Sequence, residues 1–365
     1  VVTVTASTLA EEKELLRAAA VDALVEQLGL REGTTPVSEM AGWQKPRKIV
    51  VRMDNEEALQ ALRAVAPGVE LVTVNSVAEA QAAVDGAQVL IGYCNEEIVA
   101  AGKELHWVQV YSSGVERCVA NPSLQQGDKV LTNGQRIGSP ALAEHAIAMM
   151  MTLARGLDVY HRNQVSSGSW QRDIGLAAGD IMELEGRTVL IVGLGGIGTQ
   201  AARRAHGLGM QVFATRGSRR EGPDYVDYVG LADEVTDLAT KADVVINTAP
   251  LTDRTRGMFD AAFFKAMKPS AYVYNVGRGL SIEPTALIRA LAEGWIAGAG
   301  LDVTDPEPLP EDSPLWDMPN VLLGQHSSGS SPLNADRITS IFLENLGRYV
   351  RGDPLVNVID VELGY

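Results

Sequence analysis

The chain contains few cysteines, and it has no long uncharged apolar run. Among its 365 residues only Cys94 and Cys118 are cysteines, too few for a disulfide framework or a Cys-rich zinc site. One disulfide remains arithmetically possible, but two reduced thiols in a cytosolic protein is the favoured interpretation. No apolar run reaches the ~20 residues of a membrane helix, because the longest candidate, 188–202, is interrupted by four glycines.

Basic residues are also scarce relative to acids. The sequence has 31 Lys and Arg against 46 Asp and Glu, a net charge of −15. Such a surface repels phosphate backbones and anionic lipids, so neither nucleic acid nor a membrane is expected as a partner. An anionic ligand would therefore need a local basic pocket.

Targeting and metal-binding patterns are missing as well. The first residues lack the basic start and apolar core of a signal peptide, so a cytoplasmic protein is expected, with export of a longer precursor left open. No spacing of His, Cys and carboxylates suggests a bound metal.

The length and the hydrophobic pattern indicate two α/β domains. At ~150 residues per domain, 365 residues correspond to about 2.4 domains. Short apolar strands alternate with helical stretches, which favours parallel α/β layers. The expected strands are 48–53, 87–93, 106–112, 129–133, 188–193, 210–215, 243–248, 272–276, 297–303 and 320–324. Helices are expected at 9–28, 77–84, 141–165, 198–208, 260–267, 284–293 and 334–349.

We expect a discontinuous arrangement of domains. Residues 1–46 resemble an N-terminal extension. Residues 47–150 and 333–365 would form one domain, completed by the last helix, and 151–332 the other. The helical run 141–165, about 25 residues long, is of a length that often links domains.

A glycine pattern directly follows the strand 188–193. Gly193, Gly195 and Gly198 form G-x-G-x-x-G between a strand and a helix, the context of a dinucleotide-binding loop. The first glycine permits a tight turn, the second admits a pyrophosphate and the third allows helix–strand packing. Gly196 and Ile197 begin the helix whose free N–H groups face the phosphates. The alternative is an ordinary glycine-rich turn.

The next strand indicates which dinucleotide is bound. Where an NAD enzyme usually carries an acid, this chain has Arg216, Ser218, Arg219 and Arg220, and 186–220 contains no Asp or Glu. Guanidinium groups suit a 2′-phosphate, so NADP is predicted, with NAD as the alternative. A solvated basic turn is the plainer interpretation, and the following Glu221 would weaken the positive field.

Three later strand ends carry polar residues of complementary chemistry. Arg278 follows the strand 272–276, Glu307 follows 297–303, and His326 follows 320–324. The carboxyl ends of parallel strands border the ligand crevice, so these side chains are expected to converge. Taken singly, each could instead be structural or merely solvated. The remaining histidines, His106, His145, His161 and His206, are interpreted as structural.

Seven ordered segments make the chain similar to the D-2-hydroxyacid dehydrogenase family. They lie at 112–116, 143–145, 193–198, 249–259, 275–279, 300–310 and 319–329, and the similarity covers roughly 85–350. The resemblance implies two Rossmann or flavodoxin-like domains with a cleft between them. The cofactor domain would be a doubly wound parallel sheet inserted into the substrate domain. A homodimer is implied too.

The resemblance also implies roles for individual residues. Arg278 would hold the substrate carboxylate and polarise its carbonyl, His326 would be the acid/base, and Glu307 would orient and stabilise the protonated imidazole. The Ser112, Ser113 and Gly114 turn would bind the substrate carboxylate. Asp302 would bond the nicotinamide carboxamide. The matching segments add further cofactor contacts at Ala249, Pro250, Val276 and Gly277.

The predicted activity is NADP-dependent interconversion of a small 2-oxo acid and its D-2-hydroxy acid. Glyoxylate and hydroxypyruvate are the substrates that the resemblance suggests. A phosphite or formate dehydrogenase on the same fold is one alternative, although formate enzymes pair the histidine with Gln rather than Glu. A dinucleotide-sensing regulatory protein is another, but it would leave Arg278, Glu307 and His326 unexplained.

Overall fold

The computed structural model describes residue 25 and residues 28–170 and 181–362. The predicted helix 9–28 therefore lies almost entirely outside the described residues. The chain forms two compact units, Val1–Ile137 with Pro332–Tyr365 and Gly138–Ser331. The first boundary falls before the long helix rather than at residue 150, so that helix belongs to the second unit.

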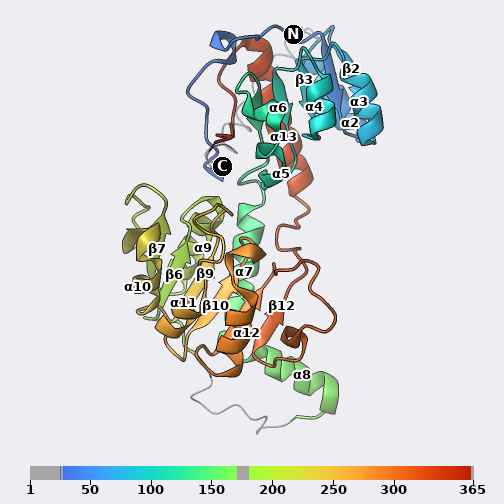
Figure 1. Cartoon of the computed structure of the whole chain (residues 1–365). Helices are drawn as coiled ribbons and strands as arrows, with labels where there is room; N and C mark the ends of the chain where they lie inside the picture. Colours follow the sequence, from blue (N-terminus) through green and yellow to red (C-terminus); the bar gives the residue numbers. More distant parts are fainter. Residues whose placement is uncertain (1–24, 26–27, 171–180, 363–365) are drawn as a thin grey trace, which may run out of the picture. The chain divides into compact units, whose positions relative to one another are not determined.

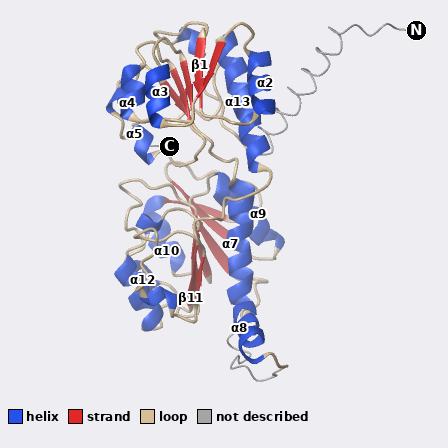
Figure 2. Ribbon diagram, turned by 90° about the vertical axis from the view of Figure 1, so that its right-hand side faces the viewer, coloured by secondary structure: helices blue, strands red, loops and turns tan. Residues whose placement is uncertain are grey.

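The first unit is built on a five-stranded parallel sheet with the order β2-β1-β3-β4-β5. Its strands are β1 (Lys48–Val51), β2 (Glu70–Thr73), β3 (Val89–Ile91), β4 (Trp107–Gln109) and β5 (Val130–Thr132). Its helices are α2 (Glu56–Val65), α3 (Val77–Ala83), α4 (Glu96–Ala101), α5 (Glu116–Val119), α6 (Pro122–Gln125) and α13 (Asn334–Arg351). The last helix, α13, returns to this unit and packs beside α2 (Figure 2).

The second unit contains a seven-stranded parallel sheet with the order β12-β11-β10-β9-β6-β7-β8. Its strands are β6 (Thr188–Val192), β7 (Gln211–Arg216), β8 (Tyr228–Leu231), β9 (Val244–Asn247), β10 (Tyr272–Asn275), β11 (Gly298–Leu301) and β12 (Val321–Leu323). Its helices are α7 (Ser139–Ala154), α8 (Leu157–Ser167), α9 (Gly196–Gly207), α10 (Val235–Ala239), α11 (Ala261–Ala266) and α12 (Pro284–Ala292). The strand order reverses between β6 and β9: β7 and β8 are added on one side of β6, and β9 to β12 on the other.

Helices cover both faces of each sheet, so each unit has two apolar layers (Figures 1 and 2). In the second unit, one layer lies under α10, α11 and α12 and the other under α7 and α9. In the first unit, the layers lie under α3 and α4 and under α2 and α13. The central strands are accordingly mostly apolar on both faces, as buried parallel strands require, whereas the edge strand β2 exposes Glu70 and Thr73. The predicted α/β class with parallel, doubly wound sheets is confirmed.

The helical run 141–165 is two helices rather than one. α7 ends at Ala154, and Gly156 adopts a left-handed backbone (φ 62°) before α8 begins. Glycine enters this region without a Cβ penalty, so it is a natural point of interruption. The apolar spacing on either side did not reveal the break.

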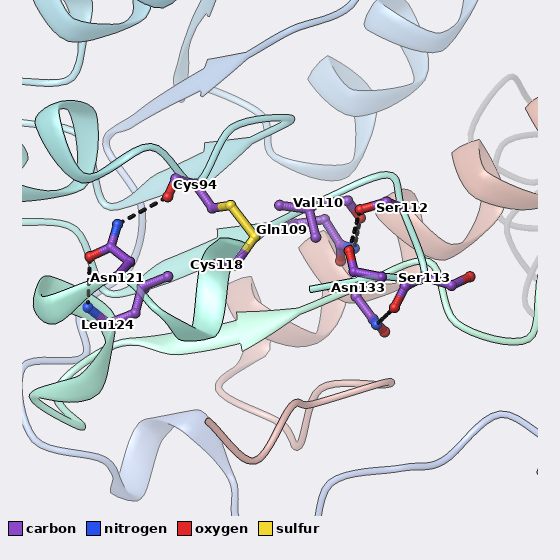
Figure 3. The surroundings of a disulfide bond; sticks show 10 residues. Cys94, Gln109, Val110, Ser112, Ser113, Cys118, Asn121, Leu124 and Asn133 are labelled. Carbon is purple, nitrogen blue, oxygen red and sulfur yellow. Dashed lines mark hydrogen bonds between the residues drawn. A yellow bond between two sulfur atoms is a disulfide. The ribbon is translucent and has the colours of Figure 1, made fainter. Parts of the chain in front are cut away.

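The two cysteines form a disulfide, which corrects the expectation of reduced thiols. Cys94 follows β3 and Cys118 lies in α5, with their Cα atoms 5.4 Å apart (Figure 3). Two residues separated by 24 positions can pair because β3 and β4 are adjacent strands whose following segments leave the same sheet edge. Composition excluded a framework of disulfides but carried no information on this proximity. In the described part of the chain, no helix is long and apolar enough to cross a membrane.

Candidate active site

The glycine loop after β6 has the geometry that a dinucleotide requires. Gly193 has φ +92°, and a Cβ there would lie 2.7 Å from the Cα of Ala249. A Cβ on Gly198 would lie 2.2 Å from the Gly193 carbonyl oxygen, whereas one on Gly195 would meet nothing within 4 Å. The first and third glycines thus close the turn, and the second leaves its backbone approachable at the start of α9. This is the division of roles that pyrophosphate binding demands.

Tertiary contacts fix this loop at the point where strand order reverses. The Thr248 hydroxyl, after β9, donates to the Gly193 carbonyl at 2.7 Å. The Leu194 N–H, within the loop, donates to the Thr215 carbonyl on β7 at 2.8 Å. The loops after β6 and β9 and the end of β7 therefore meet where the strand order reverses, the position at which open α/β sheets bind ligands.

The basic segment after β7 is less uniformly positive in space than in sequence. Arg216 is half-buried at the strand end, while Ser218, Arg219 and Arg220 are exposed. Arg220 forms an ion pair with Glu234 at 2.7 Å. The window 186–220 has no acid in its sequence, but Glu234, which lies outside it, places a negative charge next to Arg220.

Two other arginines of that window are paired in the same way. Arg204 contacts Glu144 of α7 at 2.6 Å, and Arg187 lies 3.6 Å from Asp243. Neither belongs to the segment after β7. Arg216 and Arg219 do belong to that segment, and they stay predicted contacts of a 2′-phosphate.

A buried amide pair that sequence inspection missed links the next two strand ends. Asn247 and Asn275 are the last residues of β9 and β10 and lie in register. The Asn247 side chain donates to the Asn275 side chain at 2.9 Å and to the Ser281 hydroxyl at 2.8 Å. The same side chains accept from the Ala249 and Gly277 N–H groups. The available signal was an Asn at the next-to-last position of both predicted strands, 243–248 and 272–276.

This amide pair shapes the backbone at four predicted cofactor contacts. Ala249 and Val276 are buried, and Pro250 is exposed at the edge of its loop. A Cβ on Gly277 would lie 2.9 Å from the Ala249 carbonyl oxygen. The loops after β9 and β10 therefore lie against each other.

His326 and Glu307 form the closest polar contact of the predicted catalytic set. The His326 Nδ1 and Glu307 Oε1 atoms are 2.5 Å apart, and their side chains are 54% and 40% exposed. The pair comes from the segments after β12 and β11, neighbouring parallel strands. The carboxylate fixes the orientation of the ring while leaving the pair accessible to a small molecule.

Asp302 holds the backbone that carries His326. Its fully buried carboxylate accepts from the N–H groups of Ser327 at 3.0 Å and Ser328 at 3.1 Å. Its carbonyl oxygen accepts from the His326 N–H at 2.8 Å. His326 has φ +50°, a region that non-glycine residues seldom occupy. The three bonds keep the histidine in this conformation, and the His145 Nε2 atom lies 3.9 Å from the same carboxylate.

Arg278 follows β10, beside the strand that leads to Asp302. Its carbonyl oxygen accepts from the Asn275 amide and the Ser281 hydroxyl, so the amide pair also fixes this turn. A Cβ on the next residue, Gly279, would lie 1.8 Å from the Thr304 carbonyl oxygen. The segments after β10 and β11 therefore pack backbone to backbone, which brings the Arg278 turn to the segment that continues to Glu307.

In the first unit, the Ser112–Gly114 turn follows β4 and is tied to its neighbours. The Ser112 hydroxyl donates to the Gly114 carbonyl and the Ser113 hydroxyl to the Gly134 carbonyl. The Asn133 amide donates to the Ser113 carbonyl at 2.8 Å (Figure 3). Both serines are exposed. The turn thus leads directly into α5, which carries the disulfide.

Comparison with known proteins assigns this architecture to a family. The family model "D-isomer specific 2-hydroxyacid dehydrogenase, NAD binding domain" matches residues 147–328. The glyoxylate reductase of Korarchaeum cryptofilum is 32% identical over 87% of this chain and 97% of its own. A D-isomer specific 2-hydroxyacid dehydrogenase family protein from Aeromonas salmonicida superposes with a TM-score of 0.74 at 31% identity, covering 86% of this chain and 99% of that one.

A second solved structure carries a cofactor. The NADPH-dependent glyoxylate/hydroxypyruvate reductase of Sinorhizobium meliloti, in complex with NADP and sulfate, has a TM-score of 0.73 and 26% identity. It covers 87% of this chain and 99% of its own.

The chain belongs to the D-isomer-specific 2-hydroxyacid dehydrogenase family. It is an oxidoreductase with a nicotinamide-dinucleotide-binding domain. Among the residues that the structure describes, no group of His, Cys, Asp and Glu could hold a metal ion.

Proposed function

We propose that the protein reduces a small 2-oxo acid to its D-2-hydroxy acid with NADPH. His326 would be the acid/base, Glu307 its partner, and Arg278 the group that holds the substrate carboxylate and carbonyl. The observation that carries this proposal is the 2.5 Å contact between His326 Nδ1 and Glu307 Oε1. With Nδ1 engaged by the carboxylate, Nε2 is the ring atom available to hand a proton to a carbonyl oxygen.

Reduction of a carbonyl requires a hydride at carbon and a proton at oxygen. The bound reduced nicotinamide supplies the hydride. The protonated His326 would donate from Nε2 as negative charge develops on the carbonyl oxygen. Glu307 stabilises the positive imidazolium before transfer and keeps the ring aligned. Arg278 would bind the carboxylate through its planar guanidinium and lower the energy of the developing oxyanion.

Two features support NADP as the preferred dinucleotide, with NAD as the second candidate. The segment after β7 presents Arg216, Ser218 and Arg219 where an acid would bind the ribose of NAD. The similar reductase of Sinorhizobium meliloti was solved with NADP. In this proposal the loop 193–198 holds the pyrophosphate, and Asp302 adds a contact to the nicotinamide carboxamide.

The proposed substrates are small 2-oxo acids such as glyoxylate and hydroxypyruvate. This follows from similarity to the glyoxylate reductase of Korarchaeum cryptofilum. In the first unit, the backbone of Ser112, Ser113 and Gly114 is the proposed second contact for the substrate carboxylate.

The direct test follows the absorbance of NADPH, then NADH, across a panel of 2-oxo acids. We expect turnover of the smallest acids and faster turnover with NADPH. His326→Gln should lower kcat by about 100-fold or more while the Kd for NADPH stays within about twofold. Cofactor binding without turnover of any acid would contradict the proposed reaction and favour a sensor.

A homodimer is proposed as the assembly. The helix α8 buries none of its residues, and Leu157, Tyr160, Val165 and Trp170 are 51, 46, 74 and 93% exposed. Large apolar side chains exposed in and beside one helix are typical of protein contacts. Light scattering should give twice the mass of the chain, and Tyr160→Ser with Val165→Ser should reduce it to that of a monomer.

A cytoplasmic location is proposed on the ground that nicotinamide dinucleotides are intracellular metabolites. The disulfide argues in the other direction, because disulfides persist mainly in oxidising compartments. Cell fractionation combined with thiol trapping would distinguish the two locations. Reduced Cys94 and Cys118 in the cytoplasmic fraction would agree with the proposal, and recovery of the protein only from an oxidising compartment would overturn it.

A further inference from the structure

We propose that Arg220, Tyr228 and Glu234 form a fixed support for the segment after β7, through which the protein selects a 2′-phosphorylated dinucleotide. Arg220 would act as a positioning residue in this support and would not bind the phosphate itself. The inference rests on the proposed NADP preference and assigns residues that determine it.

The support begins with a carboxylate that is held from several directions. Glu234 Oε1 accepts from the Leu231 N–H at 2.8 Å and from Arg220 at 2.7 Å. Glu234 Oε2 accepts from the Tyr228 hydroxyl at 2.6 Å. The hydroxyl of Tyr228 and the guanidinium of Arg220 lower the pKa of Glu234 to about 2, so this carboxylate is charged at every pH at which the enzyme would work.

Tyr228 is itself anchored to the sheet. It begins β8, pairs with Phe213 of β7, and its ring meets the Phe213 ring edge-on at 5.9 Å. Arg220 also donates to the Tyr228 hydroxyl at 3.1 Å. Most exposed ion pairs contribute little, because two flexible side chains must be ordered. Here the carboxylate is already ordered by β8 and the turn after it, so only Arg220 loses freedom.

Charge gives the support a second effect. An isolated Glu234 near this segment would repel a phosphate that carries about two negative charges. Arg220 neutralises it in place, and in doing so commits donors on both of its terminal nitrogens. The positive charge offered to a ligand would then come from Arg216 and Arg219. Arg220 would hold in place the segment that leads from β7 to β8.

An opposite interpretation makes a different prediction. If Arg220 were a phosphate ligand that Glu234 holds back, removing the charge of Glu234 would release it and tighten NADPH binding. If the three residues are a support, the same change would loosen the segment and weaken binding. The direction of the change in one variant, Glu234→Gln, therefore separates the two roles.

The experiment measures Kd values for NADPH and NADH by cofactor fluorescence or calorimetry. The variants are Glu234→Gln, Tyr228→Phe, Arg220→Gln and the double variant Arg220→Gln with Glu234→Gln. We expect each single variant to weaken NADPH binding about tenfold and to change NADH binding less than twofold. The double variant should be no weaker than the worse single variant, because both changes break one unit.

A matched control removes another exposed ion pair of the same unit. Arg289 and Glu293, at the end of α12, are 2.6 Å apart, and both side chains are exposed. Glu293→Gln should leave both Kd values unchanged. Tyr228→Phe retains the ring packing, so it reports on the support even if Glu234→Gln folds poorly.

Four results would overturn the inference. Tighter NADPH binding in Glu234→Gln would make Arg220 a phosphate ligand, and unchanged binding in all variants would leave the cluster without a role in selection. A wild-type protein that prefers NADH would instead overturn the cofactor proposal, and this inference with it. Loss of affinity for both dinucleotides alike would contradict selection as well.

Discussion

At the scale of single residues, the site depends on side chains whose partners hold them in one orientation. His326 illustrates this, because Glu307 fixes its ring and Asp302 fixes its backbone. In the proposed mechanism Glu307 would contribute both charge and orientation, whereas a neutral amide of the same shape would contribute only orientation. Charge and orientation can therefore be separated by substitution.

Glu307→Gln is predicted to lower kcat by about 10- to 100-fold while leaving NADPH binding unchanged. The amide can still bond Nδ1 but does not stabilise the imidazolium. Glu307→Asp keeps the charge and should recover part of the rate. Stopped-flow and steady-state measurements across pH check this, and a wild-type rate in Glu307→Gln would remove the residue from the mechanism.

His106 is a buried residue outside the site, and it makes the stability of the first unit depend on pH. It is 2% exposed, and burial lowers its pKa below the usual 6.5. In the unfolded chain the ring protonates near 6.5, so the unfolded state binds the proton first. The contribution of His106 to the free energy of unfolding is therefore fully present above pH 6.5, and it is lost as the pH falls below that value.

We predict that the free energy of unfolding falls with a slope of up to about 1.4 kcal/mol per pH unit just below pH 6.5. His106→Phe should flatten that part of the profile, because the ring no longer titrates. Urea midpoints between pH 7.5 and 5.5 measure the slope. An identical slope in both proteins would assign the effect to other groups.

At the scale of elements, the junction of β6 and α9 shows why each glycine is needed. Gly198→Ala places a Cβ 2.2 Å from a carbonyl oxygen and is predicted to cost about 1–3 kcal/mol and to weaken binding of both dinucleotides. Gly207, at the end of the same helix, has open space around its Cβ position. Gly207→Ala should be neutral or stabilising by up to about 1 kcal/mol. Thermal denaturation and cofactor titration of the two variants test the contrast.

The sequence predicted this junction because the glycine spacing and the flanking strand and helix are local signals. It also predicted which strand ends carry Arg278, Glu307 and His326. It did not predict the break at Gly156, because α7 and α8 share one run of helical spacing. It missed the Asn247–Asn275 pair and the Cys94–Cys118 bond, since both depend on which strands become neighbours.

At the scale of the whole molecule, the cofactor should act on one unit. The proposed phosphate and nicotinamide contacts all lie within Gly138–Ser331. Saturating NADPH, at about 100 times its Kd, is predicted to stabilise that unit by about 2.7 kcal/mol. Differential scanning calorimetry should therefore show one unfolding transition shifted to a higher temperature, and a second transition shifted less. If the whole heat-absorption peak shifted by the same temperature, the two units would unfold together.

The disulfide also defines what an unfolded molecule is. The chain from Cys94 to Cys118 is a closed ring that contains β4 and the Ser112–Gly114 turn. Denaturant cannot open that ring, so an unfolding experiment without reductant compares the native protein with a partly constrained chain. A single proteolytic cut within the ring would leave both fragments covalently joined. Stability and limited proteolysis thus have two reference states, selected by the thiol content of the buffer.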